Sequence, residues 1–208
     1  EFTGGLYFSG MYKYAFGVRI ELNYSKVSAY DSILAGVTGI AQARYNRNLS
    51  FKSNITEIAI VAEFHPLFTF IDWTAKDRDP PRFSPYLLLG VGFFSFNPQA
   101  NLNNKWVYLQ PLSTEGQGFA EYPDRKPYKL NAISVPIGAG VKYLLSSLVN
   151  LRFEFDYRAT NTDYIDDVST TYIDKNLYQN YFSGAKLNNA IQLTDRQRGE
   201  YPPQSYPD

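Results

Sequence analysis

The fold is decided by the stretch Met11-Tyr12-Lys13-Tyr14-Ala15-Phe16-Gly17-Val18-Arg19-Ile20-Glu21-Leu22-Asn23-Tyr24-Ser25. Aromatic or aliphatic side chains occupy every even position from Tyr12 to Tyr24, and the odd positions are mostly small, polar or charged. Such alternation places one set of side chains on each face of a β-strand, and no helix has this period. The apolar set has tyrosines at its ends and aliphatic residues in its middle, which is typical of a strand that crosses a bilayer.

The segment Leu148–Thr160 alternates in the same way, with apolar residues on one face and charges of both signs on the other. An arginine facing lipid costs about 2–4 kcal/mol near the bilayer centre, so the charged face must point into a barrel. We expect a network of ion pairs in the lumen, made by Arg19, Glu21, Lys142, Arg152, Glu154, Asp156 and Arg158. Because side chains fill the interior of a small barrel, this pattern favours a plugged lumen over an open channel.

Four further segments are predicted strands: Phe2–Phe8, Asn54–Phe64, Pro85–Phe96 and Ile133–Leu145. In the last of these, small residues oppose the apolar face and leave room for charged neighbours. The connections differ in length: 27–53, 97–132 and the part after 160 are long and polar, whereas Ser146-Ser147 is minimal and His65–Ser84 is intermediate. This asymmetry predicts extracellular long loops and shorter periplasmic turns.

The composition argues against several other classes of protein. The chain of 208 residues suits one domain, 1–208, and its formal net charge of zero gives no reason to expect a nucleic acid. Cysteine is absent, which excludes disulfides and thiol chemistry. Aromatic residues make up 17%, yet the mean hydropathy of −0.33 is too low for a helical membrane protein. No leader pattern opens the sequence, so we expect a mature chain whose signal peptide has been removed.

Six strands are too few to close a barrel in lipid, where every backbone group must be paired and the smallest barrels have about eight strands. We therefore expect an all-β, transmembrane, antiparallel up-and-down barrel of eight strands, integral to the outer membrane, with two strands missing from this chain. Two strands meet at Gly10-Met11 with almost no turn, which suggests one gap. The proline-rich stretch 201–208 cannot be a closing strand, which suggests the other.

Four blocks of sequence carry a family resemblance: 82–98, 109–118, 133–143 and 162–172. In this order they resemble the PorG-like outer-membrane barrels of Bacteroidota, and the similarity extends from about Tyr14 to Gly199. The resemblance implies an eight-stranded barrel of the type IX secretion system. Such proteins are thought to tie a periplasmic ring, of PorK and PorN or of GldK and GldN in gliding bacteria, to the outer membrane.

The chain departs from that family at the two places where strands are expected to be missing. The family has a loop, a strand and a turn after a segment like Phe2–Gly10, and it ends in an aromatic strand. Two functional classes therefore stay open: a component of the secretion or gliding machinery, and a generic structural or lipid-associated barrel. The expected partners are outer-membrane lipids and the ring proteins, with no cofactor and no small-molecule substrate.

Enzymatic activity is not expected, and no catalytic residue is predicted. His65 is the only histidine, it precedes Pro66 at a predicted turn, and the chain has no Gly-x-Ser-x-Gly elbow. A structural role is favoured for it.

Two further groups of residues are candidates for binding. Asp163, Asp166 and Asp167, with Asp174 nearby, could hold calcium, but their spacing is not that of an EF-hand and solvated loop carboxylates are favoured. Phe70, Trp73 and Arg78 lie in the predicted periplasmic turn and could contact a periplasmic protein, although Trp73 as an interfacial anchor is favoured.

Overall fold

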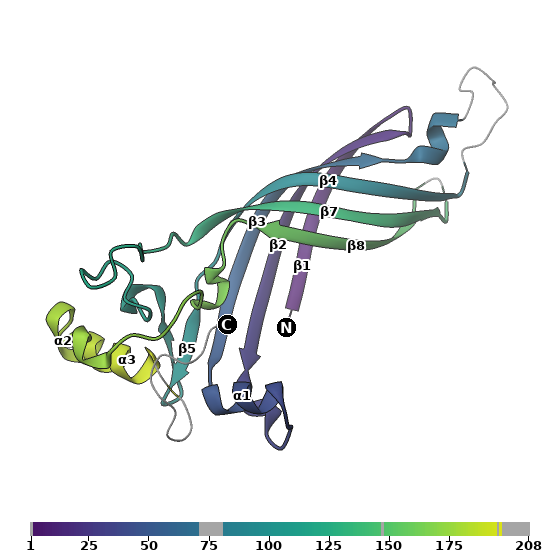
Figure 1. Cartoon of the computed structure of the whole chain (residues 1–208). Coiled ribbons are helices and arrows are strands. Elements are labelled where there is room, and N and C mark those ends of the chain that lie inside the picture. The colour runs from purple at the N-terminus through teal and green to yellow at the C-terminus, as the bar shows by residue number, and fades with distance from the viewer. Residues whose placement is uncertain (1, 71–80, 147, 195, 197–208) are drawn as a thin grey trace.

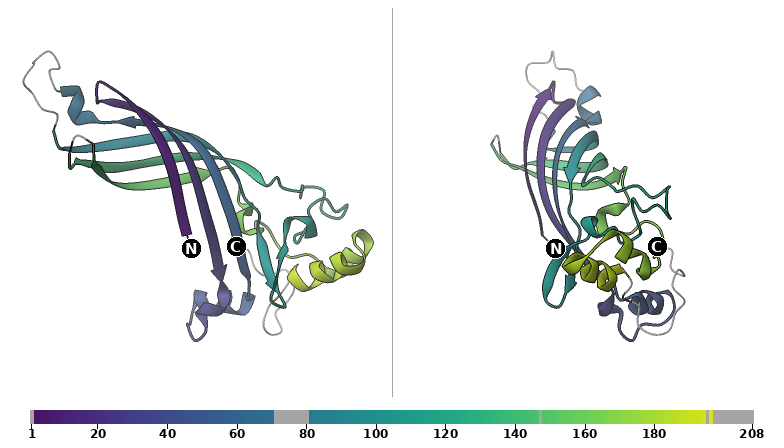
Figure 2. Two further views of the ribbon diagram at one scale, coloured as in Figure 1. Left: turned by 180° about the vertical axis from the view of Figure 1, so that it is seen from behind. Right: turned by 90° about the vertical axis from the view of Figure 1, so that its left-hand side faces the viewer.

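The computed structural model describes residues 2–70, 81–146, 148–194 and 196. Its long strands are β1 (Phe2–Tyr12), β2 (Phe16–Tyr30), β3 (Ser50–Phe64), β4 (Phe83–Ser95), β7 (Asn131–Leu144) and β8 (Asn150–Thr160). Each pairs antiparallel with the next, and the sheet curls strongly into a half-barrel (Figures 1 and 2). The predicted all-β, antiparallel, up-and-down architecture is confirmed. The remaining two strands of the eight, β5 (Gln99–Leu102) and β6 (Lys105–Tyr108), form a hairpin outside this row.

The turn between β1 and β2 corrects the prediction of one strand from Met11 to Ser25. Met11 and Tyr12 end β1, and β2 begins at Phe16. The backbone N–H of Ala15 donates to the carbonyl of Tyr12 over 3.1 Å, with Lys13 and Tyr14 at positive φ angles of 48° and 56°. The expected join at Gly10-Met11 therefore lies inside β1, and the two strands pair continuously up to the turn.

Apolar side chains cover the convex face of the sheet in rows that cross every long strand. One such row consists of Tyr12, Phe16, Phe64, Leu87, Ala139 and Phe155, which the strand register places side by side. The larger side chains of this face are exposed, for example 56% for Leu87 and 74% for Phe155. The sheet thus presents a continuous apolar surface outward.

The two ends of the half-barrel differ. At the turn end lie the β1–β2 turn, the 3₁₀ helix η2 (Pro66–Phe70) and the β7–β8 turn (Figure 1). At the loop end, the β2–β3 connection contains η1 (Asp31–Leu34) and α1 (Ile40–Arg47). Asn48 ends α1 in the left-handed conformation, and its N–H donates to the Arg44 carbonyl. Beyond β4 and β8, residues 97–130 and 161–194, with Arg196, fold together into what we call the cap module.

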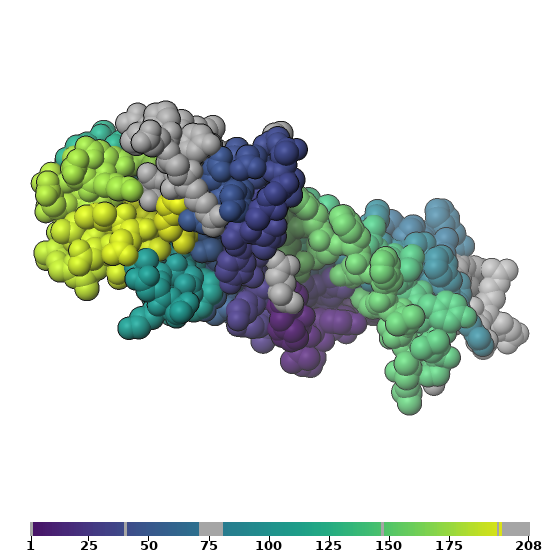
Figure 3. All heavy atoms as spheres, turned by 90° about the horizontal axis from the view of Figure 1, so that it is seen from below, coloured from purple at the N-terminus to yellow at the C-terminus, as the bar shows by residue number. Residues whose placement is uncertain are grey.

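The cap module contains β5 and β6 together with η3 (Gln110–Leu112), η4 (Tyr164–Asp166), η5 (Lys175–Leu177), α2 (Tyr178–Tyr181) and α3 (Gly184–Thr194). It has a hydrophobic core of its own, formed by Ala100, Leu109, Leu112, Phe119, Ile173, Tyr178, Ala190 and Leu193. It lies at one end of the molecule, beside the β2–β3 connection (Figure 3). The sequence predicted two long polar loops here, 97–132 and the part after 160; in the structure their described residues form one folded unit. None of the described helices is both long and apolar enough to span a membrane.

Candidate functional site

The concave face of the half-barrel is the candidate site, because charged side chains gather there. All seven residues of the predicted lumen network lie on it: Arg19 and Glu21 in β2, Lys142 in β7, and Arg152, Glu154, Asp156 and Arg158 in β8. The alternation that exposes apolar residues outward turns these charges inward. Arg19 and Glu21 are only 3% and 5% exposed.

Arg19 is the centre of the network near the turn end. Its Nη1 and Nη2 donate to the two carboxylate oxygens of Glu154 over 2.8 and 2.7 Å, and Nη1 also donates to Glu63 over 2.9 Å. Its Nε donates to Glu21. Arg152 completes this group by donating to the same oxygen of Glu63 over 2.6 Å. Since β8 is no neighbour of β2 or β3 in the sheet, the bonds from Arg19 to Glu154 and from Arg152 to Glu63 cross the hollow of the half-barrel.

Arg158 is the second centre, nearer the loop end. It donates to Glu57 over 2.8 Å, to Glu21 over 3.1 Å and to Asp156 of its own strand. Because Glu21 accepts from both Arg19 and Arg158, the two centres form one continuous chain of ion pairs along the concave face.

Two central acids, Glu57 and Glu63, were not part of the sequence-predicted network. Both lie at odd positions of β3, on the concave face of the sheet, and are buried. Their signal was available, since they share the polar face of the predicted strand Asn54–Phe64. Lys142, which was predicted, makes no ion pair within the described residues and lies directly opposite Arg152.

Gly140 of β7 lies between Tyr86 and Glu154, and its lack of a side chain lets these two residues contact each other over β7. Tyr86 of β4, Gly140 and Glu154 of β8 lie in one row, and the Tyr86 hydroxyl donates to Glu154 over 2.7 Å. A Cβ atom at Gly140 would lie 2.6 Å from the Tyr86 ring. The prediction that small residues of this strand leave room for neighbouring polar groups is thus confirmed.

His65 belongs to a buried hydrogen-bonded chain that the sequence did not reveal. Its Nδ1 lies 2.8 Å from Ser84 Oγ and its Nε2 lies 3.3 Å from Glu63 Oε2, a serine–histidine–carboxylate order. Ser84 is only 2% exposed and His65 is fully buried, so no substrate reaches the serine hydroxyl in this conformation. The Glu63 carboxylate is also occupied by two arginines. The geometry supports a structural role.

Comparison of the chain with protein-family models, with curated proteins and with solved structures found no match. The chemistry of the site is therefore argued from its geometry. A chain of ion pairs that joins β2, β3 and β8 is suited to filling a lumen and to holding a sheet in its curl.

The aspartates considered for calcium are engaged in separate contacts of the cap module. Asp163 accepts from Ser169 Oγ, Asp166 from the Val168 N–H, and Asp167 from the hydroxyls of Thr114 and Tyr128. Burial raises the pKa of Asp167 to about 7, against the opposing effect of its two hydrogen bonds. In the described part of the chain, no group of three or more His, Cys, Asp or Glu side chains could hold a metal ion.

The residues considered for a periplasmic contact are placed in part. Phe70 ends η2 at the turn end and is 86% exposed. Trp73 and Arg78 lie outside the described residues.

Proposed function

We propose that this protein is an integral outer-membrane β-barrel of the type IX secretion or gliding machinery, which anchors a periplasmic ring of the PorK/PorN (GldK/GldN) type. The observation that carries the membrane part is the inverted polarity of the sheet. Apolar residues of the convex face are exposed, whereas Arg19, Glu21, Glu57 and Glu63 are each no more than 5% exposed on the concave face. A water-soluble sheet buries its apolar face, and a barrel in lipid does the opposite.

The bilayer places one further demand on this sheet. In the described residues, β1 pairs only with β2 and β8 only with β7, so each has one edge without a strand partner. Hydrocarbon does not tolerate such edges. The proposal therefore includes closure by two further strands, the number that the resemblance to PorG-like barrels implies.

The difference between the two ends supports an orientation. We assign the turn end to the periplasm and the cap module to the outside, in keeping with the short turns and long loops of outer-membrane barrels. Phe70 then projects on the periplasmic side, where an exposed aromatic residue favours a protein contact. The ring-anchoring role itself rests on the family resemblance.

Isolation of the protein from native membranes in mild detergent tests the role. We expect ring proteins of the PorK and PorN type to co-purify, and Phe70→Asp to reduce their recovery. Ile33→Asp is the matched control, because Ile33 is also highly exposed, at 77%, but lies in η1 at the opposite end. Recovery of the barrel alone, from membranes whose ring is intact, would favour the alternative of a generic structural or lipid-associated barrel.

The ion-pair network supports the further proposal that the barrel has no open pore. The burial of Ser84 and His65 supports the proposal that their hydrogen-bonded chain does not act in catalysis. Planar-bilayer recording of the purified protein is expected to show no stable conductance, because paired side chains cross the concave face. A steady open level would contradict a plugged lumen.

A further inference from the structure

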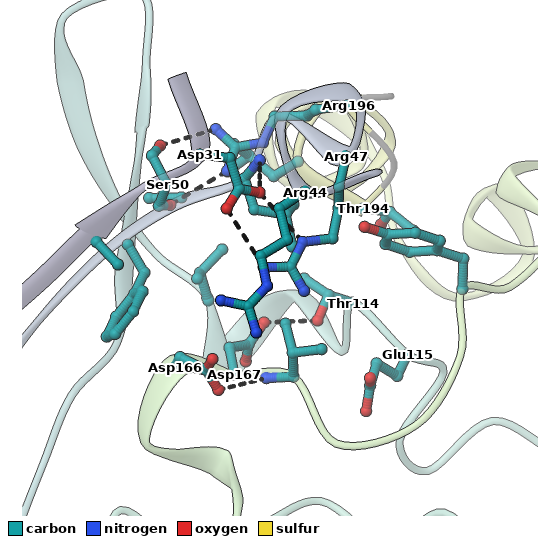
Figure 4. A pocket seen from close by; sticks show the side chains of 18 of the residues that line it. Asp31, Arg44, Arg47, Ser50, Thr114, Glu115, Asp166, Asp167, Thr194 and Arg196 are labelled. Carbon is teal, nitrogen blue, oxygen red and sulfur yellow. Dashed lines mark hydrogen bonds and ion pairs between the residues drawn. The ribbon is translucent and has the colours of Figure 1, made fainter. Parts of the chain in front are cut away.

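A cavity of about 380 Å³ lies at the loop end, between the β2–β3 connection and the cap module (Figure 4). Its lining comes from three stretches of chain within 29–51, 100–115 and 163–196. None of the residues of the concave ion-pair network lines it, so it is a site separate from the one described above.

One wall of the cavity is basic. Arg44 and Arg47 come from α1, and Arg196 follows α3. Arg47 is fixed by Asp31, to which its Nε and Nη2 donate over 3.1 and 3.3 Å. Arg44 lies nearly one helical turn before Arg47, and its side chain is exposed. Figure 4 shows Arg44 and Arg47 reaching into the cavity from α1, with Arg196 on the other side of Asp31.

Arg196 is the half-buried cation of this wall, and the acceptors of its hydrogen bonds are uncharged. It donates to the side-chain and backbone oxygens of Ser50, each over 3.1 Å, and to the carbonyl of Asn101 over 3.4 Å. Its buried Nε has no hydrogen-bond partner within the part of the chain that the structure describes. A guanidinium that is partly removed from water is stabilised most by a carboxylate or another anion, which a ligand in the cavity would supply.

The opposite wall is acidic, and backbone N–H groups of residues 168–170 hold two of its carboxylates. Glu115 accepts from the N–H groups of Ser169 and Thr170 over 3.0 and 2.8 Å, and Asp166 accepts from Val168 over 3.3 Å. Asp163 and Asp167 line the same side.

The presence of both arginines and carboxylates in the lining indicates which class of ligand fits the cavity. A simple anion would meet the acidic wall, and a simple cation would meet the arginines. Leu109, Leu193 and Phe51 add apolar surface to the lining, which suits a short carbon skeleton. We propose that the cavity binds a small zwitterion of the amino-acid or dipeptide class, with its carboxylate at Arg44 and Arg196 and its ammonium group at Asp166 and Glu115. The volume is in the range of small-molecule sites.

Isothermal titration of the full chain in detergent tests this with alanyl-alanine, alanyl-aspartate and alanyl-phenylalanine as probes. We expect at least one free dipeptide to bind, and its N-acetylated and C-amidated forms each to bind about tenfold more weakly or not at all, since each leaves one charged wall without a partner. Binding of a blocked form as tight as the free peptide overturns the proposal. So does the absence of binding for all three probes up to about 10 mM.

Two variants locate the binding to the cavity. Arg44→Gln changes an exposed residue, so the fold is expected to persist, and it should weaken the dipeptide about fivefold or more. Lys186→Gln is the matched control, because Lys186 is an exposed cation of α3 that packs over the Phe182 ring and does not line the cavity. Equal affinities of the two variants would overturn the proposed site. The result does not depend on whether ring proteins co-purify, so it is distinguishable from the proposed function.

Discussion

Arg19 shows at the scale of one residue how the charged face sets the shape of the sheet. It contacts carboxylates of its own strand, of β3 and of β8. The contact with β8 draws the last strand of the half-barrel toward the second. Removing a guanidinium and its carboxylates from water is costly unless they are paired with each other, so the loss of one member leaves the others with an uncompensated charge.

Removing the centre of this network is expected to be costly. Arg19→Gln leaves Glu63 and Glu154 with fewer cations in a buried setting, and we predict a loss of about 3–5 kcal/mol in the free energy of unfolding. Equilibrium unfolding in urea from detergent micelles measures it. Lys142→Gln is the control: Lys142 makes no ion pair among the described residues and faces Arg152, so its effect should stay within about 0.5 kcal/mol. Similar losses for both variants would contradict the network.

Asp167 gives the cap module a pH dependence. Burial raises its pKa from 3.8 in the unfolded chain to about 7 in the folded protein, so the folded state keeps a proton that the unfolded state releases. The stabilisation is fully present below pH 4 and is lost as the pH rises toward 7, to a total of up to about 4 kcal/mol. Hydrogen exchange in residues 109–130 and 161–194 should accelerate across this window beyond its intrinsic pH dependence. The Asp167→Asn variant should lack this excess acceleration of hydrogen exchange. If the acceleration persisted in the variant, a titratable group other than Asp167 would be its cause.

At the scale of the element, the β1–β2 turn explains why a strong pattern was misplaced. Paired residues in this hairpin are both even or both odd, as in Phe8 with Ile20 and Tyr12 with Phe16. The alternation therefore runs through the turn without a break and gives no sign of it. Lys13 and Tyr14 adopt positive φ without the glycine or asparagine that usually marks such a turn. The period fixes the face of each residue but not the place where the chain reverses.

Gly140 tests the fit between neighbouring strands. A Cβ atom there would lie 2.6 Å from Tyr86 and 2.8 Å from the Phe153 carbonyl, so Gly140→Ala should displace the tyrosine from Glu154. We predict a loss of about 1–3 kcal/mol in the free energy of unfolding. Gly10→Ala is the matched control in a strand, because its added Cβ would meet nothing within 4 Å. A Gly140→Ala protein as stable as the control would show that Tyr86 has room to move.

At the scale of the whole molecule, the sequence predicted the sheet better than its cap. The seven network residues could be found because strand parity alone decides which face they occupy. The cap core joins Ala100 of β5, Phe119 of a loop and Ala190 of α3, which are far apart in sequence and share no period. The cavity at the loop end was missed for the same reason: Arg44, Glu115 and Arg196 are brought together only by tertiary packing.

The polarity of the whole half-barrel leads to a prediction that separates a membrane protein from a soluble one. Ile137 is 49% exposed on the convex face, between Leu89 of β4 and Tyr157 of β8. In a bilayer, Ile137→Arg should lower the free energy of unfolding by about 2–4 kcal/mol, and Ile137→Gln by less, because lipid cannot solvate the guanidinium. Ile33→Arg, in η1 outside the apolar rows, should have little effect. Urea unfolding from phospholipid vesicles measures all three variants. In water a half-exposed arginine would be harmless, so an unchanged Ile137→Arg protein would remove the argument that this face meets lipid.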